Sequence, residues 1–269
     1  MKLSNIFSKR NRVLLRELVV TDFKLRYQGS VLGYAWSLLK PLFLFAIMYV
    51  VFGVLVKLGT IEHYAVYLLL GIVLWNFFAE ATNQGLASII SRGDIIRKIS
   101  FPRYIIVLST TISALVNLTL NLVIVVILMV VNGVDIHMSA FMFPLYIIEI
   151  YVLGLGLALF LSAINVKYRD TGHIWEIIMQ AAFYATPIIY PLSIVIAKSE
   201  LAAQFLMMNP VAQAIQGARY SLITHDTMTV TTLFNNVWFN LIPLGLVILI
   251  FVFGALYFKK NSKYFAESI

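Results

Sequence analysis

The residues best placed to do chemistry gather in the stretch 89-IISRGDIIRKISFPRYIIVL-108, which lies between two long apolar runs. Ser91, followed three residues later by Asp94, is typical of a capped helix start, and the acid lies near the positive end of the helix dipole. Pro102 ends such a helix, because the residue before a proline is pushed out of helical geometry. We therefore expect a short amphipathic helix over residues 91–101, suited to the groove of a partner protein. The simpler alternative is a well-capped basic loop between two membrane spans.

Two acids, Glu80 and Glu149, fall inside long apolar runs. Ionisable residues at membrane depth are costly and are functional candidates by default. Each could carry a coupling ion or pair inside the helix bundle. Two acids without visible inverted repeats give little support for a self-sufficient ion-coupled carrier, which stays an alternative. Asn117 and Asn121, in another apolar run, are expected to form hydrogen bonds between helices.

Motifs for catalysis or nucleotide binding are absent from the sequence. It contains no GxxxxGK[ST] phosphate loop, no HExxH and no GxSxG. It has no cysteine, which excludes disulfides, thiol nucleophiles and Cys-type metal sites. We therefore expect no catalytic residue, no metal and no cofactor in this chain, which counts against a membrane-embedded transferase. If ATP drives the protein, a separate partner must bind ATP and Mg²⁺.

Membrane-spanning helices must position these residues. The chain of 269 residues is 61% hydrophobic and 12% charged, whereas an ordinary soluble domain is about 45–50% apolar and about 25% charged. A helix needs roughly 20 apolar residues to cross a bilayer. The sequence therefore predicts an all-α, polytopic membrane protein that forms a single domain over residues 1–269. Six spans are expected, over residues 34–56, 64–87, 104–131, 140–163, 174–196 and 237–258. The fifth is the weakest, because it contains Pro187 and Pro191.

Basic residues indicate the orientation of the chain, because cytoplasmic loops carry an excess of Lys and Arg. Of the 20 Lys and Arg residues, Lys57, Lys198 and Arg219 fall on one side of the expected membrane and the others on the opposite side. The richer side holds both termini and residues 89–108, so it is expected to be cytoplasmic. The net charge of +8 is thus a topology signal. Nucleic-acid binding is not expected, because no soluble basic domain is present to carry it.

Two segments outside the spans are expected to form shorter helices. Residues 5–30 are too charged to cross, but Leu14, Leu18 and Leu25 recur at helical spacing. This pattern indicates an interfacial helix on the cytoplasmic leaflet. Residues 197–236 are too long for a simple turn and are expected to form two short external helices broken at an Asn-Pro pair. The expected order is an interfacial segment 1–30, five spans over 34–196, external helices 197–236, a sixth span 237–258 and a cytoplasmic tail 259–269.

Several segments resemble one family of membrane proteins. The stretch IIRKISFPRYIIVL, residues 95–108, resembles the coupling-helix region of ABC-type exporter permeases for polysaccharides and polyol phosphates, such as O-antigen, capsular polymers, rhamnose polymers and teichoic acids. The resemblance covers nearly the whole chain, and LLRELVVTDFKLRYQGSVLGYAWSLLKPL, residues 14–42, is its most specific part. The other similar segments are INVKYRDTGHIWEI (164–177), FYATPIIYPLSIV (183–195) and NPVAQAIQGARY (209–220).

The resemblance implies a homodimer of this chain that works with two copies of a separate ATPase subunit, and that subunit would bind ATP and Mg²⁺. Residues 10–27 would form an amphipathic gate helix beside the ATPase, and residues 197–224 would form an external gate. The implied ATPase contacts are Arg92, Asp94, Ile95, Ile96, Arg97, Lys98 and Phe101. The implied external gate residues are Pro187, Pro191, Asn209, Pro210 and Arg219.

The resemblance also implies a channel at the dimer interface, which a lipid-linked polymer would enter laterally from the cytoplasmic leaflet. Sugar rings stack on aromatic faces, although aromatic residues also form interfacial belts and fill bundles. Cations pair with phosphate, although each basic residue alone could contact lipid headgroups instead. Lys40 is expected just before the deep part of the first span begins at Pro41. The candidate channel aromatics are Tyr34, Trp36, Phe45, Tyr49, Phe183, Tyr184 and Tyr190. The candidate contacts to the carrier pyrophosphate are Arg16, Lys24, Arg26 and Lys40.

The sequence thus predicts the permease subunit of an ATP-driven exporter for a lipid-linked polysaccharide or teichoic-acid-type polymer. We expect it to be a multi-pass protein of a bacterial cytoplasmic membrane, in contact with membrane lipids. A type-2 ABC permease for a drug or small lipid would share the coupling helix but would need no aromatic pore. An ion-coupled carrier would instead transport without ATP and depend on Glu80 or Glu149.

Overall fold

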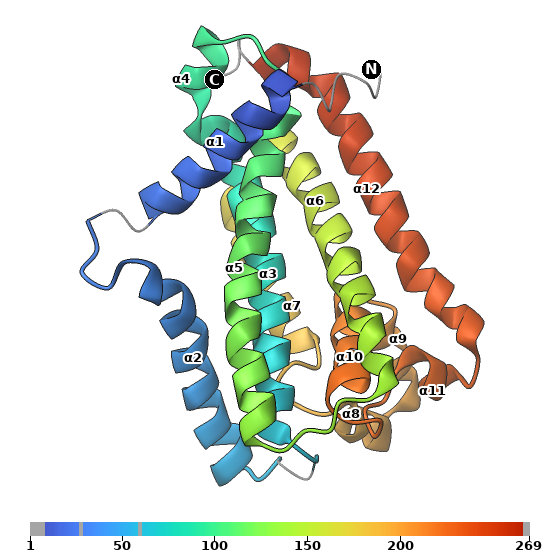
Figure 1. The fold of residues 1–269 in the computed structure, drawn as a ribbon. Helices are drawn as coiled ribbons and strands as arrows, with labels where there is room; N and C mark the ends of the chain where they lie inside the picture. Colours follow the sequence, from blue (N-terminus) through green and yellow to red (C-terminus); the bar gives the residue numbers. More distant parts are fainter. Residues whose placement is uncertain (1–8, 27–28, 59–60, 266–269) are drawn as a thin grey trace.

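The structure, a computed structural model, describes residues 9–26, 29–58 and 61–265, without the side chains of residues 23, 25 and 26. Over this part of the chain every regular element is a helix (Figure 1). This agrees with the all-α prediction. The main helices are α1 (Lys9–Arg26), α2 (Trp36–Met48), α3 (Tyr64–Ser91), α4 (Gly93–Lys98), α5 (Tyr104–Val131), α6 (Phe143–Lys167), α7 (Thr171–Ala185), α8 (Leu192–Lys198), α9 (Glu200–Met207), α10 (Pro210–Leu222), α11 (Val230–Phe234) and α12 (Leu241–Asn261).

Within the described residues, five helical segments are long and apolar enough to cross a membrane. Short 3₁₀ or π turns extend three of them at their ends, including the π turn η3 (Tyr49–Leu55) after α2. The five segments correspond to the first four and the last of the predicted spans. They are Gly33–Leu55, Tyr64–Ser91, Tyr104–Val131, Met138–Lys167 and Val237–Tyr264.

The fifth predicted span, residues 174–196, is wrong as a continuous helix. Helix α7 ends at Ala185, and Thr186 is extended with a ψ of 136°, as expected for a residue before proline. The chain resumes a helix only at Leu192, after Pro191 in an extended conformation. The segment is apolar enough, but its two prolines interrupt the helix that the composition alone suggested.

Pro41 does not begin a helix, because α2 begins at Trp36 and Pro41 lies buried inside it. Proline has no N–H, so it cannot donate to the carbonyl four residues earlier, which belongs to Ser37. The side chain of Asn121 replaces that donor, with its Nδ2 3.3 Å from the Ser37 carbonyl oxygen. Asn121 therefore links α5 to α2, as the sequence predicted for an amide inside a span.

Helix α3 lies at the centre of the bundle, packed between α5 and α6, while α12 packs on the other side of α6 (Figure 1). Glycines allow two of these close approaches. A Cβ on Gly85 of α3 would lie 2.3 Å from the Cβ of Ala158 in α6, and one on Gly156 of α6 would lie 2.6 Å from the Cα of Phe251 in α12. Small residues at such crossings let helix backbones approach closely, which drives helix association in membranes.

Replacement of Gly156 by leucine is expected to separate α6 from α12 and to lower the stability of the protein by about 1–3 kcal/mol or more, because the backbone of α12 cannot move aside without losing its packing. Thermal unfolding in mild detergent would measure the loss. Gly245→Leu is the matched control, since a Cβ at Gly245 has no atom within 4 Å. Equal stability of the two variants would contradict this account of the α6–α12 contact.

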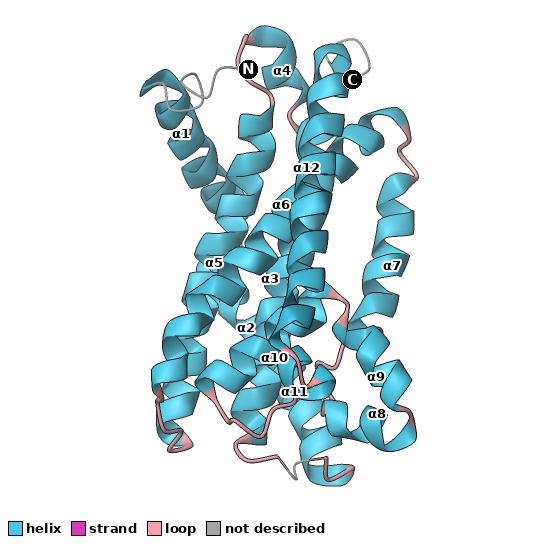
Figure 2. Cartoon of the chain, turned by 90° about the vertical axis from the view of Figure 1, so that its right-hand side faces the viewer, coloured by secondary structure: helices cyan, strands magenta, loops and turns pink. Residues whose placement is uncertain are grey.

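Short helices gather at both ends of the bundle. Helices α1 and α4 and the end of α12 lie at one end, and α8, α9, α10 and α11 lie near the other (Figures 1 and 2). The predicted break at an Asn-Pro pair is confirmed: Asn209 precedes α10, its Oδ1 accepts a hydrogen bond of 3.0 Å from Val211 N, and Pro210 is the first residue of α10. Residues 211–219 of α10 are all buried, so this short helix is inserted into the bundle rather than laid on its surface.

Candidate coupling surface and polar groove

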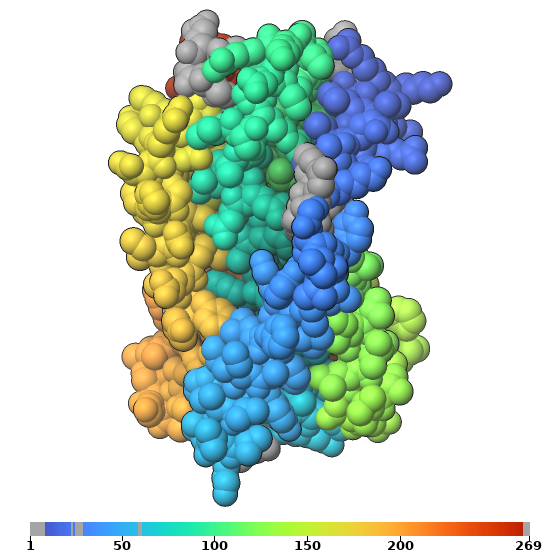
Figure 3. Space-filling model, turned by 90° about the vertical axis from the view of Figure 1, so that its left-hand side faces the viewer, coloured from blue at the N-terminus to red at the C-terminus, as the bar shows by residue number. Residues whose placement is uncertain are grey.

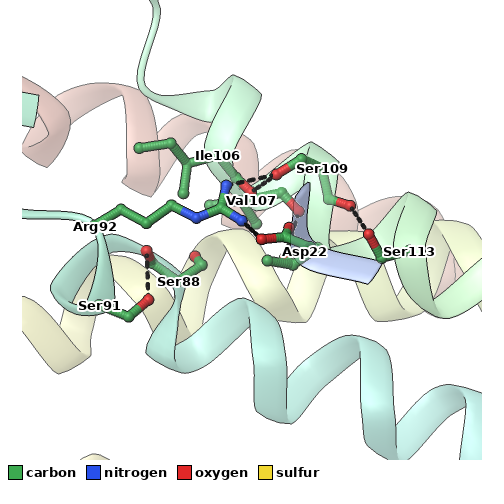
Figure 4. Close-up of polar contacts among 9 residues, drawn as sticks. Asp22, Ser88, Ser91, Arg92, Ile106, Val107, Ser109 and Ser113 are labelled. Carbon is green, nitrogen blue, oxygen red and sulfur yellow. Dashed lines mark hydrogen bonds and ion pairs between the residues drawn. The ribbon is translucent and has the colours of Figure 1, made fainter. Parts of the chain in front are cut away.

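The predicted amphipathic helix is present but shorter than expected. Helix α4 covers Gly93–Lys98, and Ile99 is already extended. The predicted capping box is wrong, because Ser91 belongs to the last turn of α3 and donates a 3.1 Å hydrogen bond to the carbonyl oxygen of Ser88 (Figure 4). Arg92 occupies the N-cap position without a side-chain cap.

The two faces of α4 differ in exposure. Ile96 is only 7% exposed and packs into a core with residues of α3, α5, α6 and the end of α12. Ile95 and Phe101 are half-buried. The opposite face is exposed and mostly polar, and we call it the coupling surface. It consists of Asp94, Arg97, Lys98, Ile99 and Ser100.

Arg92 fixes α4 to its neighbours rather than facing outward. Its guanidinium forms an ion pair with Asp22 of α1, and its Nη1 donates a 3.0 Å hydrogen bond to Ser109 Oγ of α5 (Figure 4). Burial lowers the pKa of Arg92 from its ordinary value. Breaking such a partly buried pair leaves an uncompensated charge, so the pair holds α1 and α4 in one arrangement.

Asp22 was missed in the sequence, although a signal was available. It follows Leu14 and Leu18 at intervals of four residues, so it falls on the face of α1 that turns toward the bundle. An acid in line with an apolar stripe indicates a buried cation nearby. Leu18 is buried and Val13 and Val20 are exposed, in agreement with the predicted stripe.

Two further bonds join the segment after α4 to other helices. Arg10 Nη2 of α1 donates a 3.1 Å hydrogen bond to the carbonyl oxygen of Ser100. Arg103 donates one to the carbonyl oxygen of Ser262, just after α12. A displacement of α4 would therefore be transmitted to α1, α5 and the end of α12.

A polar groove of about 630 Å³ opens beside α2, over α3 and α5. In Figure 3, α3 lies recessed beside the residues of α2. Glu80 is held there, because Asn117 Nδ2 donates to its Oε2 at 2.6 Å and Gln84 Nε2 donates to its Oε1 at 3.0 Å. Amides and carboxylates are groups that hydrogen-bond sugar hydroxyls. The polar lining consists of Ser30, Ser37, Lys40, Asn76, Glu80, Gln84, Asn117 and Asn121, and Trp36 adds an aromatic face.

The predicted channel aromatics form two groups on either side of α3. On the α2 side, Phe45 packs on Tyr49 at 5.7 Å between ring centroids, and Tyr49 stacks on Tyr64 of α3 at 6.4 Å. On the α7 side, Phe183 lies edge-on to Tyr184 at 5.3 Å. The remaining members are Trp36 in the groove, Tyr34 exposed before α2, and Tyr190, whose hydroxyl donates to the Tyr184 carbonyl oxygen at 3.1 Å.

The predicted carrier contacts do not all lie together. Arg16 and Lys24 are exposed on α1, whereas Lys40 is exposed on α2 and lines the polar groove. Arg26 ends α1, and its side chain lies outside the described part of the chain.

Arg219 of α10 is fully buried and joins three parts of the fold. Its Nη1 donates to the carbonyl oxygen of Pro187 at 2.7 Å, its Nη2 to that of Ile188 at 2.6 Å and its Nε to that of Tyr67 at 3.0 Å. Its guanidinium also lies over the Tyr67 ring, 3.5 Å from the centroid. The space exists because residue 71 is glycine, where a Cβ would lie 2.2 Å from Arg219 Nη2. Two of the predicted gate residues, Pro187 and Arg219, are thus in direct contact.

Comparison with known proteins places the chain in a family. Residues 13–223 match the family described as ABC-2 type transporter. The chain is 31% identical over 199 residues to the "O-antigen export system permease protein RfbA" of Myxococcus xanthus, which covers 74% of this chain and 76% of that protein. It is 31% identical over 216 residues to a protein of the same name from Klebsiella pneumoniae, covering 78% and 82%. A second Klebsiella pneumoniae protein of that name is 30% identical over 203 residues, covering 75% and 77%. The chain is a polytopic membrane protein that belongs to the ABC-2 type transporter family.

Proposed function

We propose that this chain is the permease subunit of an ATP-driven exporter that moves a lipid-linked polysaccharide across a bacterial cytoplasmic membrane. The observation that carries the proposal is the similarity to O-antigen export permeases over about three quarters of the chain. The polar groove supports it, because its lining of amides, one acid, one cation and Trp36 suits sugar hydroxyls and ring faces.

The coupling surface would receive a separate ATPase subunit, which would bind ATP and Mg²⁺. Its exposed polar face on a short helix fits a groove in a partner. The contacts of Arg92 with α1 and α5, and that of Arg103 with the end of α12, provide a physical route by which ATP-driven movement of the partner would reach the spans. Two ATPase copies would act on a homodimer of this chain.

A homodimer is favoured by the exposure of the first span. Only 6% of the residues in the apolar stretch of this span are buried, whereas 78% are buried in the corresponding stretch of α3. In the proposed dimer, the polar groove beside α2 and the two groups of aromatic residues would border a glycan channel. Arg16, Lys24 and Lys40, with Arg26, would meet the carrier pyrophosphate on the way in.

We also propose that α7 and α8 together make the sixth crossing. Helix α7 has 15 residues, which is ~22 Å at 1.5 Å per residue and too short to cross alone. A non-helical segment follows α7, and α8 lies near the far end of the bundle (Figure 2). Both termini and α4 would then be cytoplasmic, and α8–α11 would form the external gate.

Co-purification and transport together test this proposal. The chain, expressed with its neighbouring genes, is expected to be isolated with a phosphate-loop ATPase and to accumulate lipid-linked glycan outside only when ATP is hydrolysed. A catalytic-site mutant of the ATPase is the control. Transport under an ion gradient without ATP would instead support a secondary carrier. ATP-dependent transport of a drug or small lipid without glycan transport would support the alternative ABC permease.

A further inference from the structure

A second cavity, of about 680 Å³, lies between α6, α10, α11 and α12, away from the polar groove. One wall is apolar and belongs mainly to α6 and α12. The other carries Glu149 of α6, Gln213 of α10 and several hydroxyl groups. The lining contains no Lys, Arg or His among the residues that the structure describes. The cavity therefore combines one acid without a matching cation with a surface suited to hydrocarbon.

Glu149 and Gln213 are each 7% exposed. Glu149 Oε1 and Gln213 Oε1 have no hydrogen-bond donor within the described part of the protein. The Gln213 side chain hydrogen-bonds to the Glu149 carboxylate, but each side chain keeps one oxygen without a donor, and an unpaired buried polar atom is costly. Both unpaired atoms are acceptors, so the ligand that completes the site must supply N–H or O–H donors. A positive charge would also compensate Glu149.

The remaining residues that line the cavity suit the phosphate and the acyl chains of a phospholipid. Tyr146, Tyr220 and Thr229 bring hydroxyl groups that can donate to a phosphate. The apolar wall offers a bed for acyl chains, and a volume near 680 Å³ accommodates a headgroup with the upper part of its chains. The apolar wall consists of Leu145, Ile148, Val152, Leu244, Val247 and Ile248.

We propose that this cavity binds a phospholipid with a primary ammonium headgroup, namely phosphatidylethanolamine, with its ammonium donating to Glu149 and Gln213. Charge complementarity selects ethanolamine over glycerol headgroups, which carry no positive charge. The need for N–H donors selects it over choline, whose quaternary nitrogen has none. The lipid would sit between the inserted helix α10 and the last span, and its binding does not depend on the substrate of the exporter.

Native mass spectrometry of the intact chain tests the proposal, using membrane discs with equal amounts of phosphatidylethanolamine, phosphatidylcholine and phosphatidylglycerol. We expect phosphatidylethanolamine to be retained about tenfold over the other two, as for one charge-assisted hydrogen-bonded pair. Glu149→Gln should abolish this preference. Glu80→Gln, whose acid already has donors from Asn117 and Gln84, should keep it.

Two further measurements distinguish a bound phospholipid from a free amine and from a folding defect. Leu244→Trp would fill part of the cavity from its apolar wall while leaving Glu149 in place, so it should also abolish phosphatidylethanolamine retention. This variant tests the proposal if Glu149→Gln fails to fold. Dodecylammonium tests a free amine as the source of the ammonium. Equal retention of the three lipids, or an undiminished preference in Glu149→Gln, would overturn the proposal. Retention of dodecylammonium without phosphatidylethanolamine would overturn the lipid assignment.

Discussion

Replacement of Arg219 by methionine is expected to lower the free energy of unfolding by about 3–5 kcal/mol. The guanidinium donates to the carbonyl oxygens of Pro187 and Ile188, which lie in the non-helical segment between α7 and α8. Each buried acceptor left without a donor costs about 1–3 kcal/mol. Methionine keeps much of the volume but offers no N–H, so the segment would lose its attachment to α10.

Thermal unfolding in mild detergent measures this loss, and a fall of roughly 10 °C is expected for a chain of this size. Arg219→Lys should fall between the wild type and Arg219→Met, because an ammonium lacks the planar fork that reaches several carbonyls at once. Arg169→Met is the matched control, since Arg169 is exposed. If Arg219→Met unfolds at the same temperature as this control, the carbonyl contacts do not hold the segment.

Reversal of charge at Arg97 and Lys98 is expected to release the proposed ATPase subunit without unfolding the permease. Both side chains are exposed on the coupling surface. Close charge pairs across an interface are worth about 1.5 kcal/mol or more, so the double change to glutamate should weaken association at least ~100-fold. Co-purification of the ATPase and permease-stimulated ATP hydrolysis should fall together.

The control is the same charge reversal at Lys259 and Lys260. These residues are exposed at the same end of the bundle, near the end of α12. If both double variants lose the ATPase equally, general charge rather than the coupling surface recruits it. Ile96→Asp is a poorer probe, because Ile96 packs in the core of this chain and a buried carboxylate there would destabilise the permease itself.

The sequence predicted those features that depend on composition along the chain. The long apolar runs of α3, α5, α6 and α12 required helices of spanning length, and the Asn-Pro pair required the break before α10. It failed where a proline breaks an apolar run or where tertiary contacts decide the outcome. Hydropathy reports how apolar residues 174–196 are, but the prolines decide whether one helix forms. Ser91 fits a capping box only if α3 ends before it, and α3 instead includes it.

The candidate site was predictable in part for the same reason. Exposure of Arg97 and Lys98 follows from the amphipathic pattern of α4, but the inward face of Ile96 depends on the core formed by other helices. The sequence pattern placed Arg219 in a short external helix. Its burial is explained by carbonyl oxygens of a proline-broken segment more than 30 positions away in the chain, and no local pattern contains that information.

The hydrogen bond from Asn121 to the Ser37 carbonyl oxygen marks a point at which α2 can bend. A regular helix is stiff because backbone hydrogen bonds join each turn to the next. At Pro41 one of these bonds is missing, and the side chain of Asn121 from α5 donates to the Ser37 carbonyl oxygen instead. Proline is a common site of helix bending. If the hydrogen bond from Asn121 to the Ser37 carbonyl oxygen breaks, α2 can bend at Pro41 while α3 stays packed in the centre of the bundle. Of the helices that line the polar groove, α2 could therefore bend while α3 stays in place. Bending of α2 would widen the groove for a bulky ligand.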